Sequence, residues 1–154
     1  MPNATQSAPT AQGSSGTARV HKIASRIYGV LGVLMATFLF LSGALAIAAR
    51  STGSTYGGII EKPAAVSGIY GPYILSASIV LIVLAVLIFT QRTIGAIAFL
   101  GFSVANEIVG YLVPALNVDG VWSFTLVDAI VYAILLTLTA IVIIAERVAR
   151  SVKG

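Results

Sequence analysis

Four uninterrupted apolar runs constrain this chain more than any other feature of its sequence. They cover residues 27–49, 70–90, 94–116 and 124–145. A helix rises about 1.5 Å per residue and a hydrocarbon core is roughly 30 Å thick, so each run is long enough to cross a bilayer. In lipid the backbone polar groups must be satisfied within the segment, which favours helix. The sequence predicts an all-α integral membrane protein, an antiparallel bundle of four transmembrane helices.

Composition narrows the function classes. Of the 154 residues, 58% are hydrophobic and 9% are charged, whereas a soluble domain carries roughly 25% charged residues. The chain has no cysteine and one histidine, His21. This excludes disulfides, thiolate metal sites and a haem held by two histidines of this chain alone, and we expect no cofactor or metal. The net charge of +4 does not form a dense basic patch, so no nucleic-acid partner is expected.

Three regions are expected along the chain. Residues 1–20 hold almost no charge and are rich in Ser, Thr, Ala, Gly and Gln, which predicts a disordered tail. Residues 21–150 form the transmembrane bundle, and residues 151–154 form a short C-terminal tail. A cleavable signal peptide is the alternative for the first segment, but its apolar run exceeds the roughly 7–15 residues typical of such peptides.

The distribution of Lys and Arg predicts the orientation. Arg50 and Lys62 lie on one side of the predicted topology, and seven basic residues lie on the other. Cytoplasmic segments carry the excess of Lys and Arg, so both termini are predicted to be cytoplasmic, in the inner (plasma) membrane of a bacterium. The seven are Arg19, Lys22, Arg26, Arg92, Arg147, Arg150 and Lys153.

Two carboxyls inside the spans are the best functional indication in the sequence. Glu107 lies in the third segment, directly after Asn106, and Asp128 lies near the start of the fourth. Each has a tyrosine four residues later on its own helical face, Tyr111 and Tyr132 respectively. The predicted intramembrane polar cluster consists of Ser103, Asn106, Glu107, Tyr111, Asp128, Tyr132 and Arg50.

Small residues form a stripe along the first segment that lets another helix approach closely. They are Gly29, Gly32, Ala36 and Gly43, and the same stripe leads on to Arg50. We expect this stripe to face the polar faces of the third and fourth segments and to form the bundle interior with them. The second segment, which carries no charge, is then expected to face lipid.

Two interpretations of the carboxyls stay open. Burial and mutual proximity raise the pKa of a carboxyl, so Glu107 and Asp128 could share a proton or bind a cation. Alternatively, Glu107 is protonated or pairs with Arg50 or a tyrosine hydroxyl, and only locks the helices together. The second, structural interpretation is favoured.

Three functions follow in order of preference. The first is a non-catalytic accessory or regulatory subunit of a larger bacterial inner-membrane complex, with lipid import favoured over a respiratory complex as its host. Its expected partners are membrane lipid and other integral membrane subunits. The second is a small proton- or cation-coupled transporter using Glu107 and Asp128, and the third is a membrane enzyme acting on a lipid or quinone. The layout is similar to that of small bacterial membrane families, including the DoxX-like proteins, in topology alone.

Overall fold

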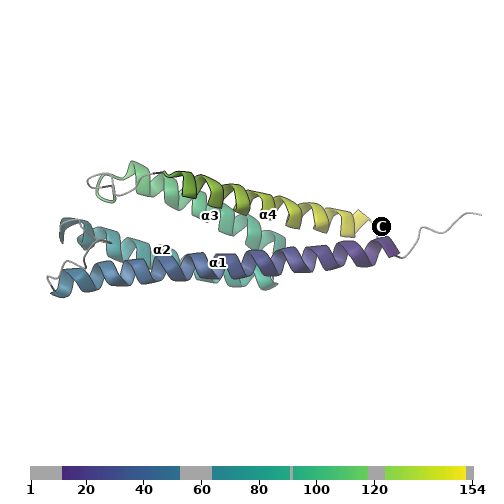
Figure 1. Cartoon of the computed structure of the whole chain (residues 1–154), viewed down its shortest axis with the longest axis horizontal. Helices are drawn as coiled ribbons and strands as arrows, with labels where there is room; N and C mark the ends of the chain where they lie inside the picture. The colour runs from purple at the N-terminus through teal and green to yellow at the C-terminus, as the bar shows by residue number, and fades with distance from the viewer. Residues whose placement is uncertain (1–11, 53–63, 91, 118–123, 152–154) are drawn as a thin grey trace, which may run out of the picture.

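The computed structural model describes residues 12–52, 64–90, 92–117 and 124–151. These residues form four helices, α1 (Gln12–Thr52), α2 (Ala64–Thr90), α3 (Arg92–Leu112) and α4 (Leu126–Ser151) (Figure 1). Each helix contains an apolar stretch long enough to span a membrane, and consecutive helices run in opposite directions. The predicted fold class, a four-helix membrane bundle, is confirmed.

The helices are arranged as a ring in which each one packs on two neighbours. α1 packs most extensively on α2 and also contacts α4, while α3 packs between α2 and α4. The start of α1 and the end of α4 lie together (Figure 1), and we call this the terminal end of the bundle. The opposite end, where α1 and α3 finish, is called the loop end.

The first helix is longer than predicted. α1 begins at Gln12, so residues 12–20 continue the helix instead of belonging to a disordered tail, whereas residues 1–11 lie outside the described part of the chain. Extending an existing helix adds one hydrogen bond for each residue that is fixed, and it avoids the cost of a new nucleus. The stretch after Pro9 contains no proline to interrupt it.

The third helix is shorter than predicted. It ends at Leu112, four residues before the expected boundary, and residues 113–117 form a turn. Pro114 accounts for this, because a proline disfavours helical geometry in the residue before it. In the turn, the N–H groups of Leu116 and Asn117 both donate to the carbonyl of Val113, at 2.9 and 3.0 Å. The other ends differ as well, because α2 begins at Ala64 and α4 runs on to Ser151.

The small-residue stripe of α1 is buried as predicted, but its main partner is α2. A Cβ added at Gly43 would lie 2.8 Å from the backbone nitrogen of Leu75, and one at Gly29 would collide with the ring of Phe89. Only Gly32 also approaches α3, through Phe99. The expectation that this stripe faces α3 and α4 while α2 faces lipid was wrong. α2 is apolar on all sides, so its sequence does not indicate which side packs against other helices and which faces lipid.

α2 and α3 form a tight hairpin at the terminal end. A Cβ added at Gly95 would lie 2.5 Å from the backbone nitrogen of Ile88, so the backbones of the two helices touch here. Only a residue without a side chain allows this approach.

Tyr28 lies at the centre of the core and is fully buried. Its hydroxyl donates a hydrogen bond to the carbonyl of Ala96 on α3, at 3.2 Å. Its ring meets the ring of Phe99 edge to face, with the centroids 5.8 Å apart, an arrangement that is favourable for aromatic pairs. Tyr28 therefore ties α1 to α3 across the bundle.

Candidate functional site

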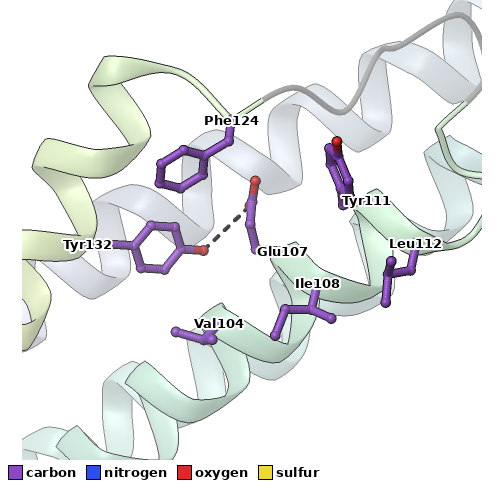
Figure 2. A pocket seen from close by; sticks show the side chains of 7 residues that line it. All are labelled: Val104, Glu107, Ile108, Tyr111, Leu112, Phe124 and Tyr132. Carbon is purple, nitrogen blue, oxygen red and sulfur yellow. Dashed lines mark hydrogen bonds between the residues drawn. The ribbon is translucent and has the colours of Figure 1, made fainter.

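A pocket of about 480 Å³ lies between α3 and α4 toward the loop end. Figure 2 shows the Glu107 carboxyl between the aromatic rings of Tyr132 and Phe124 on one side and Tyr111 on the other. The remaining walls are aliphatic side chains of α3. They are Val104, Ile108 and Leu112.

Tyr132 connects α4 to the Glu107 carboxyl. Its hydroxyl lies 3.0 Å from the carbonyl oxygen of Ser103 and 3.5 Å from a carboxylate oxygen of Glu107. The Tyr132 ring stacks on that of Phe124, with the centroids 6.3 Å apart and the planes 19° from parallel. Packing on Phe124 fixes the ring, and the ring in turn places its hydroxyl beside Glu107 (Figure 2).

α2 adds two more tyrosines to the surroundings of Glu107. Tyr70 and Tyr73, both half-buried, lie within electrostatic range of its carboxyl. Glu107 therefore lies among tyrosines of both helices that flank α3.

Asp128 has a local role at the start of α4. The backbone N–H and the hydroxyl of Thr125 donate to one of its carboxylate oxygens, at 2.7 and 2.6 Å, and its own N–H lies 3.3 Å from the Thr125 hydroxyl. These reciprocal bonds form a capping box, which satisfies N–H groups that a helix start leaves unpaired. The spacing Thr125-x-x-Asp128 was the available sequence signal.

The predicted polar cluster is therefore divided. Glu107, Tyr111 and Tyr132 line the pocket, and Ser103 contributes its backbone carbonyl to Tyr132. Asn106 points elsewhere: its side chain is buried away from the pocket lining, and its Oδ1 has no hydrogen-bond partner among the described residues. The side chain of Arg50 lies outside the described residues, so its pairing with Glu107 stays a prediction.

Sequence reasoning missed Phe124 and the aliphatic wall of the pocket. Val104, Ile108 and Leu112 are 40–68% exposed, and nothing in an apolar run distinguishes a pocket wall from a lipid-facing side chain. The pocket is formed by side chains of α3 together with Phe124 and Tyr132, and the pattern of a single helix does not show which residues of another helix lie against it.

Chemically, the pocket is an open, almost wholly apolar groove, with one carboxyl and two tyrosine hydroxyls among the side chains that line it. Its volume lies in the range of small-molecule sites, about 300–1,000 Å³. No three His, Cys, Asp or Glu side chains of the described residues come together as a metal site would require. Comparisons with family models, with curated proteins and with solved structures give no match.

Proposed function

We propose that this chain is a non-catalytic accessory subunit of a larger bacterial inner-membrane assembly that handles lipids, and that it holds an apolar molecule with a polar head in the α3–α4 pocket. The termini are proposed to be cytoplasmic, as the distribution of Lys and Arg favours. The observation that carries the proposal is the Glu107 carboxyl at the wall of an otherwise apolar and aromatic pocket.

The energetics of Glu107 support an occupant. Five residues separate it from the end of α3, so it lies about 7 Å inside the helix. A carboxyl at this depth is costly when it faces hydrocarbon. One of its carboxylate oxygens lies 3.5 Å from the Tyr132 hydroxyl. A ligand head that donates hydrogen bonds, such as a hydroxyl or an amine, would stabilise the carboxylate further, because hydrogen bonds to a charged group are strong.

The shape of the pocket favours a lipid-like molecule. Its aliphatic wall follows one face of α3 through Val104, Ile108 and Leu112, and an alkyl chain placed along it would be buried against a matching surface. A chain lying on this wall with its head at Glu107 is the arrangement expected of a single-tailed or branched lipid. This supports a lipid-handling host over a respiratory one.

A transporter that uses two carboxyls has weaker support. The Asp128 carboxyl already accepts two hydrogen bonds within its capping box, so a proton or cation path would have to work with Glu107 alone. Opening the cap to free Asp128 would leave N–H groups at the start of α4 without partners.

The proposal is tested by crosslinking from a defined position. A photoreactive amino acid at Ile108, on the pocket wall, should crosslink to lipid in native membranes. The same probe at Leu136, which is 61% exposed on α4 and does not line the pocket, reports crosslinking to bulk lipid, and its adduct should not respond to changes in the pocket. Glu107→Gln and Tyr132→Phe should each reduce the Ile108 adduct several-fold, whereas Thr137→Val, on the exposed face of α4, should not.

The accessory role is tested by isolation in mild detergent. The chain should copurify with the same integral membrane proteins in repeated preparations, and their removal should leave the bound lipid in place. Purification as an isolated chain in every mild detergent would contradict the accessory role. Unchanged Ile108 adducts in both Glu107→Gln and Tyr132→Phe would contradict the pocket.

A further inference from the structure

All four helices meet at the terminal end around a second pocket, of about 320 Å³, to which α2 contributes its last residue, Thr90. His21 comes from α1, Arg92 and Thr93 from the start of α3, and Glu146 and Arg150 from the end of α4. Two guanidinium groups, an imidazole and one carboxyl therefore share a small space.

Arg92 is a half-buried cation whose hydrogen-bond partner is a neutral imidazole. Its Nη1 lies 3.0 Å from Nδ1 of His21, and because a guanidinium only donates, Nδ1 must accept and carries no proton. Among the described residues Arg92 forms no ion pair with a carboxylate, since the ion pair at this site joins Arg150 to Glu146. A partly buried charge without a counterion favours the binding of an anion.

The carboxyl in the pocket is already compensated. Glu146 accepts hydrogen bonds from the hydroxyl of Thr93 and from the guanidinium of Arg150. Both of its oxygens are therefore engaged, and with two guanidinium groups against one carboxylate the pocket keeps a net positive charge. The described residues near this end also include Arg19, Lys22, Arg26 and Arg147, so the surrounding field is positive.

The backbone at the start of α3 also favours the binding of an anion. Arg92, Thr93 and Ile94 line the pocket and are the first three residues of α3, so their N–H groups have no partner within the helix. The dipole of a helix also favours negative charge at its start.

We propose that this pocket binds a phosphate group, and that the phosphate belongs to the headgroup of an anionic phospholipid. The guanidinium of Arg92 offers two parallel donors to phosphate oxygens, Arg150 closes the pocket from α4, and the start of α3 adds backbone donors. This site is separate from the α3–α4 pocket and does not depend on what that pocket binds.

The position of the pocket favours a lipid over a free phosphate. Arg92 is the first residue of a 21-residue span, so it lies where the hydrocarbon core gives way to headgroups. Basic pockets between transmembrane helices at this level are typical sites for acidic lipid headgroups.

The experiment measures dissociation constants for the full chain in an uncharged detergent by native mass spectrometry. The probes are dioctanoyl-phosphatidylglycerol, dioctanoylglycerol, which lacks the phosphate, and inorganic phosphate. Arg92→Gln should weaken phosphatidylglycerol binding by about tenfold or more, as expected for the loss of a charge-assisted hydrogen bond. Arg92→Lys should weaken it less, and neither change should affect dioctanoylglycerol.

The matched control is Arg147→Gln, which removes the same charge from an exposed residue at the same end of the bundle that does not line the pocket. It should weaken binding by less than about twofold. Glu107→Gln should leave phosphatidylglycerol binding unchanged, which separates this site from the α3–α4 pocket. If Arg92→Gln fails to fold, Arg150→Gln replaces it, because the Arg150 side chain is 79% exposed.

Two results would overturn the proposal: equal weakening by Arg92→Gln and Arg147→Gln, or phosphatidylglycerol binding no tighter than dioctanoylglycerol. Competition by inorganic phosphate at the same concentration as the lipid would support the phosphate site and assign it to a soluble ligand. Failure of millimolar phosphate to compete would assign it to the lipid.

Discussion

The hydroxyl of Thr139 on α4 lies 3.0 Å from the phenol oxygen of Tyr28 on α1, so the first and last helices share a buried hydrogen bond. Tyr28 also donates to the Ala96 carbonyl of α3. A single phenol therefore holds three helices at one level of the bundle, where it is fully buried. In an apolar interior such a bond fixes how the helices are rotated relative to one another.

Removing this bond should destabilise the bundle measurably. Tyr28→Phe and Thr139→Val keep the shape of the side chains, and each should lower the free energy of unfolding by about 1 kcal/mol. Because they remove one shared contact, the double variant should lose less than the sum of the two. Unfolding in a detergent titration followed by circular dichroism measures this. Additive losses would mean that the two residues act independently.

The capping box of α4 predicts that Thr125 and Asp128 both stabilise the start of this helix. Thr125→Ala and Asp128→Ala should each cost about 0.5–2 kcal/mol, the usual range for losing a helix cap. Asp128→Ala should leave the crosslink from Ile108 intact, because Asp128 does not line the pocket. Thermal unfolding and the adduct yield are the two measurements. A lost adduct in a folded Asp128→Ala protein would show that this carboxyl does more than cap the helix.

The crossing of α1 and α2 predicts a sharp difference between two glycines. Gly43→Ala should destabilise the protein, because the new Cβ would lie 2.8 Å from the backbone nitrogen of Leu75 and 3.1 Å from the Gly71 carbonyl. Gly101→Ala meets nothing within 4 Å and should stabilise α3 by about 1 kcal/mol through helix propensity. Melting temperatures of the two variants compare them directly. Equal effects would contradict the close crossing.

The orientation is testable because the chain has no cysteine. Ser151→Cys and Gly16→Cys should react with a membrane-impermeant maleimide only after the cells are permeabilised. Asn117→Cys, at the loop end, should react in intact cells. Labelling of Ser151→Cys in intact cells would reverse the proposed topology.

The sequence was sufficient to predict the fold class, because a segment that spans a bilayer must have a minimum length and a largely apolar composition. Four runs of the right length leave little choice of architecture. The helix partners were not readable in the same way. The stripe at Gly29, Gly32 and Gly43 indicated a close approach but not which helix approaches, and the uniformly apolar α2 gave no competing face.

The sequence predicted the polar residues of the candidate site, but not which residues of different helices meet there. Glu107 could be expected to pair with Arg50 or a tyrosine hydroxyl, because a polar side chain in a span needs a partner, but which tyrosine lies beside it could not be predicted. By charge and by depth in the span, Asp128 looked equivalent to Glu107. The signal that distinguishes it is Thr125, three residues earlier, because a threonine at this spacing is typical of a capping box at the start of a helix. His21 and Arg92, 71 residues apart, meet only through the packing of α1 against the α2–α3 hairpin.

The contact of Gly95 with the backbone of Ile88 bears on how the protein reaches the bilayer. α3 carries Asn106 and Glu107 and has the least apolar composition of the four spans, whereas α2 is the most apolar. Because the last turn of α2 touches the first turn of α3, we expect the two helices to leave the insertion machinery as one unit, with the apolar α2 helping its more polar neighbour to insert. In the Gly95→Leu variant, we then expect a fraction of the chains to carry α3 and α4 in the inverted orientation, which cysteine labelling would detect. This fraction should be detectable before any loss of stability is measured in the correctly inserted chains.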